Sequence, residues 1–157
     1  MPGPLRVADF PRPPAIERES RRITVTLGGI MIADTLQAWR ILETTHPPTY
    51  YLPPDAFRPG STAPGSARRS FCEWKGEADY VTLIGGARAE RDAGWTYPDP
   101  APPYAALRDH IALYAGRMDS CTVGDEIVTP QPGGFYGGWI TSDLIGPFKG
   151  SPGTEWW

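Results

Sequence analysis

The chain has 157 residues and a formal net charge of -3 at pH 7, and its only adjacent basic pairs are Arg21-Arg22 and Arg68-Arg69. Because a protein that neutralises nucleic-acid phosphates needs a clustered positive face, this charge pattern argues against nucleic acid as a partner. The content of 19 Pro, 18 Gly, 6 Trp, 7 Tyr and 5 Phe indicates one folded domain with many turns, since disordered chains are poor in aromatic residues.

The N-terminal segment, residues 1–20, carries five prolines, at positions 2, 4, 11, 13 and 14. Proline lacks the amide donor and has a fixed φ, so we expect this segment to be extended and loosely attached. We expect residues 21–157 to form a single β-rich domain. At its start, residues 22–27 alternate as a strand does, Gly28-Gly29 predicts a hairpin turn, and residues 30–33 form the returning strand.

Two short strands and a loop are predicted next. Residues 38–43 form an apolar run that is too short for a helix and is closed by His46-Pro47-Pro48. Residues 50–52 are a further short strand. Residues 57–67 are rich in Gly, Pro and Ser, which is typical of a loop.

Residues 70–80 hold the densest mixture of polar and aromatic side chains in the chain. The run predicts a strand and a turn centred on Lys75-Gly76, followed by a strand over residues 78–84. Gly85-Gly86 turns the chain again, and residues 93–97 form a short aromatic strand that ends at Pro98.

The remainder contains the best helical candidate, residues 104–110, where Leu107 and Ile111 are spaced i, i+4. Residues 111–114, 118–123 and 126–129 follow as a meander of strands, and residues 130–157 form a Gly- and aromatic-rich tail. The whole pattern predicts an all-β fold of compact antiparallel sheets with at most one short helix.

Parts of the sequence also repeat one another. Val25-Thr26-Leu27-Gly28-Gly29 resembles residues 81–86 with one insertion, and Trp74-Lys75-Gly76 resembles Phe148-Lys149-Gly150. These matches indicate either two related β-layers or a generic hairpin sequence that occurs twice.

The start of the chain lacks the apolar stretch of a signal peptide, and no apolar run is long enough to span a bilayer. We therefore expect a cytoplasmic protein without membrane contact, in which Cys72 and Cys121 are free thiols. These cysteines and the two histidines, His46 and His110, do not pair at the spacing of zinc ligands, so we expect no metal site.

Several motifs together resemble a known family. In chain order they are Leu42-Glu43-Thr44, residues 47–51, Cys72-Glu73-Trp74-Lys75-Gly76, Ala78-Asp79-Tyr80 and residues 95–98. The sequence is similar, from about Arg22 onward, to the domain of unknown function 427, which also carries a nucleotidyltransferase-like label, and its tail resembles the single-domain bacterial branch. The resemblance implies a β-rich, tent- or barrel-like fold and implies no activity. Glu73 stands where the family pattern has proline, which makes this turn less rigid.

The residues with the most chemistry predict a small-molecule site on a concave face. Glu43, Lys75 and Cys72 are the catalytic candidates. The residues expected to contact a ligand are Glu43, Tyr50, Tyr51, Arg69, Trp74, Lys75, Tyr80, Trp95 and Tyr97. An aromatic wall with a few cations suits a small polar or anionic ligand, bound by a binding module or by an enzyme of unassigned class. The alternatives are that Trp74 and Trp95 are core residues, that Lys75 is solvated at its turn and that Cys72 is merely a small strand residue.

Two other functions remain open. A metal-dependent nucleotidyltransferase needs a Gly-Ser turn for phosphate and two carboxylates for Mg²⁺, and Gly65-Ser66 followed by Glu77 and Asp79 has that order. Alternation along a strand would place both carboxylates on one face. A protein-interaction domain would instead use the Gly- and aromatic-rich tail. No cofactor and no oligomeric state follows from the sequence.

Overall fold

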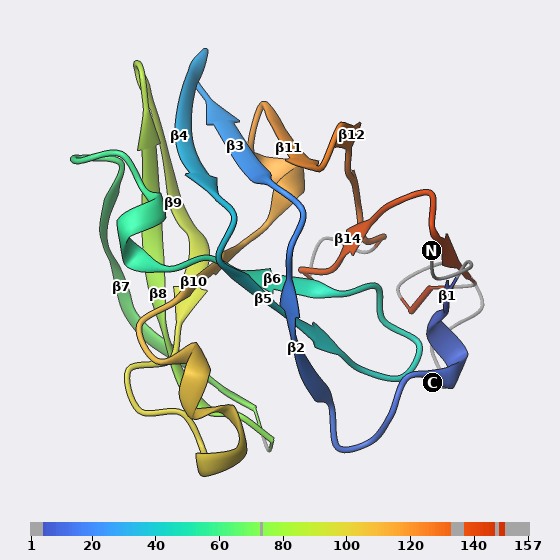
Figure 1. Ribbon diagram of the computed structural model, residues 1–157. Coiled ribbons are helices and arrows are strands. Elements are labelled where there is room, and N and C mark those ends of the chain that lie inside the picture. Colours follow the sequence, from blue (N-terminus) through green and yellow to red (C-terminus); the bar gives the residue numbers. More distant parts are fainter. Residues whose placement is uncertain (1–4, 73, 133–136, 147, 150–157) are drawn as a thin grey trace.

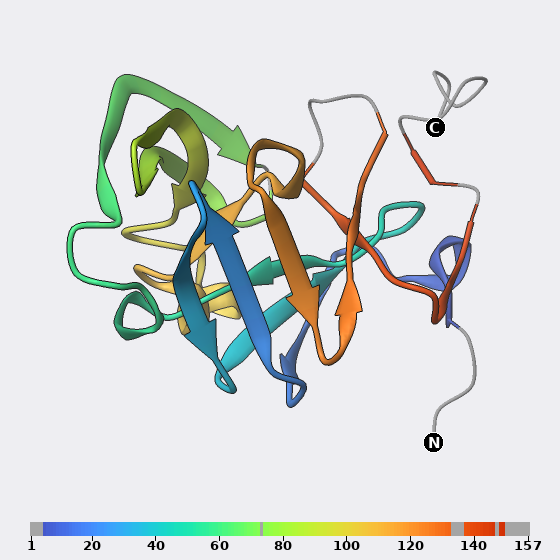
Figure 2. The same cartoon turned by 90° about the horizontal axis from the view of Figure 1, so that it is seen from above.

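The computed structural model describes residues 5–72, 74–132, 137–146 and 148–149, and it confirms the all-β prediction (Figures 1 and 2). The largest sheet is antiparallel, with the order β10-β9-β8-β7, and its strands are Ile111–Leu113, Arg88–Thr96, Gly76–Gly85 and Thr62–Cys72. A second antiparallel sheet has the order β12-β11-β3-β4, made of Glu126–Ile127, Ser120–Val123, Ile23–Leu27 and Ile30–Thr35. Seen from above, these four strands lie side by side (Figure 2).

Three smaller sheets complete the fold. One has the order β2-β5-β6, with strands Ala15–Glu19, Ala38–Leu42 and Thr49–Tyr51. The strands β13 (Thr129–Pro130) and β14 (Trp139–Ile140) are antiparallel, and β1 (Leu5–Arg6) is parallel to β15 (Leu144–Ile145). No sheet of the described residues closes into a barrel.

The described residues contain no α-helix, only the 3₁₀ helices η1 (Val7–Asp9), η2 (Pro54–Ala56), η3 (Pro102–Leu107) and η4 (Ala115–Arg117). The helix expected over residues 104–110 corresponds to η3, which begins earlier and ends before His110. None of these helices is long and apolar enough to cross a membrane.

The prediction of a loop over residues 57–67 is wrong from Thr62 onward, because β7 begins there. This strand lies at the edge of its sheet, where proline is tolerated, so Pro64 does not interrupt it. The pairing with β8 does shift between Pro64 and Arg69, which is where the Gly- and Ser-rich sequence lies.

The N-terminal segment was expected to be extended and loosely attached. Of its described part, residues 15–19 are extended as β2, and each of them pairs with a residue of β5. Val7 is fully buried with Phe10 and Leu144 in a small apolar cluster. Of the predicted tail, residues 130–157, the structure describes residues 130–132, 137–146 and 148–149, and the remainder lies outside the described residues.

The core is divided by the four-stranded sheet that contains β8. Val81 and Leu83 point to one side, into the main cluster with Val25 and Leu27 of β3. Ala78 belongs to a second cluster with Tyr51, Tyr97, Tyr104 and other residues. Cys72, Trp74 and Trp95 pack against this second cluster.

The two hairpin turns predicted from Gly-Gly pairs exist, and their backbones touch. Gly28 has φ +59°, and a Cβ added there would lie 2.7 Å from the carbonyl carbon of Gly85. A Cβ added to Gly86 would in turn lie 3.5 Å from the Cα of Gly28. The β3–β4 and β8–β9 turns therefore pack without any side chain between them, at the top of Figure 1.

This contact predicts different costs for two neighbouring substitutions. Gly28→Ala and Gly29→Ala both place a side chain at positive φ, which costs about 1–2 kcal/mol each. Only Gly28→Ala also clashes with the opposite turn, because nothing lies within 4 Å of a Cβ at Gly29. We expect Gly28→Ala to lower the free energy of unfolding by about 1–3 kcal/mol more than Gly29→Ala, as measured by urea denaturation. Equal losses in the two variants would contradict the contact.

Candidate functional site

Alternation along β5 and β6 determines which aromatic side chains enter the second cluster. Tyr51 lies opposite Trp39 in the strand pairing, so these side chains share the face that packs in this cluster. Tyr50 lies opposite Arg40 and points to the other face, where its ring packs 5.1 Å from that of Trp139. Of two adjacent tyrosines, only Tyr51 therefore faces the candidate site.

The same rule selects residues from the four-stranded sheet. Cys72 and Ser70 share a face of β7, and Ser70 lies opposite Ala78 of the second cluster. Arg69 points to the opposite, exposed face, where it lies 3.1 Å from Asp79 and 3.7 Å from Glu77. Arg69 therefore lies apart from the second cluster, beside Glu77 and Asp79.

Lys75 occupies the turn between β7 and β8 and is only 7% exposed. Its carbonyl oxygen accepts a hydrogen bond of 2.8 Å from the Ala101 amide, just before η3, which holds the turn against this segment. The prediction considered a solvated Lys75 as the alternative, and the burial of this lysine excludes that alternative.

The charge of Lys75 is maintained by its surroundings. Burial by itself would lower the pKa of its ammonium, but interactions with the side chains of Tyr51, Cys72 and Glu43 raise it above the ordinary value. None of the ion pairs within 4 Å among the described residues includes Lys75. A buried cation thus faces a thiol, a phenol and a more distant carboxylate.

Two tyrosine hydroxyls complete the surroundings of Lys75. The Tyr51 hydroxyl accepts a hydrogen bond of 3.2 Å from Nε1 of Trp95, and the rings of Tyr51 and Tyr97 lie 6.1 Å apart. Burial raises the pKa of both tyrosines, so both hydroxyls keep their protons at neutral pH and can donate hydrogen bonds. We call the group formed by Glu43, Tyr51, Cys72, Lys75 and Tyr97 the polar centre.

Glu43 follows β5 directly and is half-buried, and it contacts a residue that the prediction had considered only as a zinc ligand. Oε2 of Glu43 lies 3.6 Å from Nε2 of His46, while Nδ1 of His46 lies 3.2 Å from the amide nitrogen of Gln131. Burial lowers the pKa of His46, and the nearby Lys149 and Lys75 lower it further, while Glu43 opposes this. His46 is therefore neutral near pH 7.

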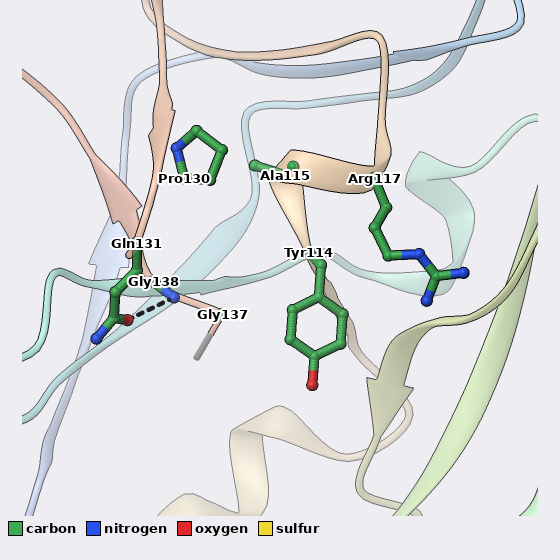
Figure 3. Close-up of a pocket in the computed structure, with 8 residues that line it drawn as sticks. Tyr114, Ala115, Arg117, Pro130, Gln131, Gly137 and Gly138 are labelled. Carbon is green, nitrogen blue, oxygen red and sulfur yellow. Dashed lines mark hydrogen bonds between the residues drawn. The ribbon is translucent and has the colours of Figure 1, made fainter. Parts of the chain in front are cut away.

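Gln131 also lines a cavity of about 290 Å³, which we call the Tyr114 cavity (Figure 3). Its walls include Tyr114, which precedes η4, Pro130 of β13, and Gln131 with Gly137 and Gly138. In Figure 3 the Gln131 amide oxygen accepts a hydrogen bond from the Gly138 amide, and the Arg117 side chain extends on the side away from Gln131. The centre of the Tyr114 ring lies 4.9 Å from that of the Trp95 ring. Trp95 in turn donates its Nε1 hydrogen bond to the hydroxyl of Tyr51, a residue of the polar centre.

The remaining aromatic candidates lie at the border of the site. Trp74 and Trp95 are half-buried and pack against the second cluster. Tyr80 lies opposite Trp95 in the β8–β9 pairing and so shares its face, and it also lines a shallow hollow of about 320 Å³ with Pro64 and Thr96. The structure thus brings Glu43, Tyr51, Cys72, Lys75 and Tyr97 together, with Trp74 and Trp95 at their edge, and separates Tyr50 and Arg69 from them.

The residues of the nucleotidyltransferase alternative lie elsewhere. Glu77 and Asp79 do share one face of β8, but the guanidinium of Arg69 contacts both. The Ser66 amide donates to the carboxylate of Asp92 at 2.7 Å, so a protein anion already occupies the place that a phosphate would need. Among the described residues, no group of three or more His, Cys, Asp or Glu side chains could hold a metal ion.

Sequence reasoning missed Gln131 and Tyr114 as neighbours of the site. Both lie more than 30 residues from the motif around Lys75, on β-connections that no local pattern relates to it. The one signal available was the repeat of Trp74-Lys75 as Phe148-Lys149, because Lys149 also approaches His46 and its carbonyl oxygen accepts a 2.8 Å hydrogen bond from Gln131.

The lowered pKa of His46 predicts how stability depends on pH. In the unfolded chain His46 takes up a proton near its ordinary pKa of 6.5, whereas the folded state does so only at lower pH. The free energy of unfolding should therefore fall as the pH drops from about 7 towards 5, above the range in which carboxylates titrate. Denaturation across this range should show the slope reduced in His46→Asn and kept in His110→Asn. A slope that persists in His46→Asn would contradict this assignment.

Comparison with known families relates this geometry to other proteins. The model of the family described as Domain of unknown function (DUF427) matches residues 15–124, which include Glu43, Tyr51, Cys72, Lys75 and Tyr97. No curated protein matches the chain. The match spans more than half of the 157 residues, and it agrees with the motifs quoted above. The chain belongs to the DUF427 family.

Proposed function

We propose that the protein binds a small, polar, anionic molecule at the polar centre. The observation that carries this proposal is Lys75, an ammonium that is 7% exposed and that has no carboxylate within 4 Å among the described residues. Removing an ammonium from water costs several kcal/mol, and a close ion pair is the usual compensation. A buried cation without one is a common feature of binding and catalytic sites.

The neighbours of Lys75 support an anionic ligand that also carries a hydrogen-bond donor. The ammonium would hold an oxyanion, and the protonated hydroxyls of Tyr51 and Tyr97 would donate to its other oxygen atoms. Glu43 would accept a hydrogen bond from a hydroxyl or amine of the same molecule. Short hydroxy acids and phosphate monoesters of polyols have this combination of groups.

The same groups would allow catalysis if the ligand carries an electrophilic carbon. The Cys72 thiol lies beside Lys75 and is half-buried, so it is accessible enough to act as a nucleophile. Whether the domain is a binding module or an enzyme then depends on the ligand. The two alternatives, a metal-dependent nucleotidyltransferase and a protein-interaction domain, would use residues outside the polar centre.

The proposal predicts that one substitution removes binding without loss of stability. Lys75→Met keeps the length of the side chain and removes the desolvation cost of a buried ammonium, so we expect the fold to persist. The probes would be inorganic phosphate, glycerol 3-phosphate, lactate and ATP, each with and without Mg²⁺. A probe at a concentration of about 100 Kd should stabilise the wild type by about 2.7 kcal/mol, or roughly 5–10 °C in Tm, and should leave Lys75→Met unchanged.

Two further variants serve as controls. Arg69→Met removes an exposed cation from the opposite face and should respond to the probes like the wild type. Glu43→Gln keeps the shape of the side chain and should weaken binding of the hydroxylated probes while the fold persists. Equal shifts in wild type and Lys75→Met, or no shift with any probe, would refute the proposal. Stabilisation by ATP that requires Mg²⁺ would favour the nucleotidyltransferase alternative.

A further inference from the structure

Besides Lys75, Gln131 is a buried polar residue near the polar centre, and it is 4% exposed. Two backbone hydrogen bonds fix the orientation of its side-chain amide. Its Oε1 accepts a 3.0 Å hydrogen bond from the backbone amide of Gly138. Its Nε2 donates a 2.8 Å hydrogen bond to the backbone carbonyl of Lys149. A backbone amide can only donate and a carbonyl can only accept, so the two ends of the Gln131 amide cannot be exchanged.

This orientation determines the tautomer of His46. The second N–H of the Gln131 amide points at Nδ1 of His46 over 3.2 Å, so Nδ1 must be the acceptor. In a neutral imidazole the proton then sits on Nε2, which is the nitrogen 3.6 Å from Oε2 of Glu43. The chain Gln131–His46–Glu43 therefore presents an N–H, and not a lone pair, to the carboxylate.

We propose that Gln131 is a positioning residue of the ligand site, which holds His46 as its Nε2–H tautomer so that His46 directs an N–H at the Glu43 carboxylate. This inference rests on the proposed function, because Glu43 belongs to the polar centre. Its consequence for the site is that the Glu43 carboxylate is oriented as a hydrogen-bond acceptor for the ligand. Gln131 also lines the Tyr114 cavity, so a molecule in that cavity would touch the first member of the chain.

Burial and the charges around His46 act on its protonation in opposite directions, and burial is the largest of these effects. Glu43 favours the imidazolium, whereas Lys149, Lys75 and burial oppose it. A donor at Nδ1 acts in the same direction as burial, because protonation of that nitrogen would break the hydrogen bond from Gln131 and leave two N–H groups facing each other.

A purely structural role for Gln131 would be to connect Gly138 with Lys149, and the tautomer of His46 distinguishes the two roles. The chain has two histidines, so nitrogen-15 NMR of the imidazole rings gives one signal set for His46 and one for His110 as an internal reference. In the wild type at pH 7 we expect His46 to be neutral, with its proton on Nε2. A proton on Nδ1, or an imidazolium, would overturn the inference with no ligand involved.

Two substitutions extend the test. Gln131→Glu keeps the shape and the acceptor for Gly138, but it places a carboxylate at Nδ1, so the titration of His46 should move up by about 1–3 pH units. Gln131→Met removes the donor without adding charge, and should release His46 into a mixture of tautomers. The titration of His110 should stay unchanged in both variants. If the His46 signals in both variants match those of the wild type, Gln131 only connects backbone segments.

The ligand readout separates this inference from the proposed function. If glycerol 3-phosphate binds the wild type, the pH dependence of its affinity should differ between Gln131→Glu and the wild type, because His46 of the variant then titrates in the measured range while the titration of the phosphate is common to both. If Lys75→Met loses binding but the His46 signals of the Gln131 variants match those of the wild type, the proposed function is retained and the role of Gln131 is refuted. If His46 has the expected tautomer but no small anion binds, the effect of Gln131 on His46 is retained and the proposed function is refuted.

Discussion

The backbone contact between the β3–β4 and β8–β9 turns sets the geometry of the whole domain. Gly28 and Gly85 approach so closely that no side chain fits between them, and Gly28 adopts a positive φ that other residues rarely adopt. Each turn is the end of a hairpin, so fixing the two ends fixes the distance between the sheets. The main core fills the space that remains, with Val25 and Leu27 on one side and Val81 and Leu83 on the other.

The candidate site depends on the same sheet, but on its other face. Strand β8 contributes Val81 to the main core and Ala78 to the second cluster, so a shift of one residue in its pairing would exchange core and site. The groups of the polar centre are thus attached to strands and a short turn that the main core already holds in place. Such support gives the precise orientation that a small ligand requires.

The sequence predicted those parts of the structure that depend on neighbouring residues in the chain. The Gly-Gly turns and the strands between them follow from alternation and from turn residues, whereas Glu43, Cys72 and Lys75 were grouped by the chemistry of their side chains. It failed for residues 57–67, because their composition does not reveal that β7 is an edge strand that tolerates Pro64. It also grouped Tyr50 with Tyr51 and Arg69 with Lys75, since the face that a strand residue occupies is determined by its partner strand.

The polar centre and the residues that adjust it lie on different parts of the chain. Glu43, Tyr51, Cys72, Lys75 and Tyr97 fall within the stretch that matches the DUF427 family, whereas Gln131 and Lys149 lie beyond residue 124. Within a family of this kind, a different C-terminal extension would leave the buried ammonium and the thiol intact and would replace the amide behind His46. The ligand preference that we propose would then differ between relatives through residues beyond 124 alone, without any change in the shared scaffold.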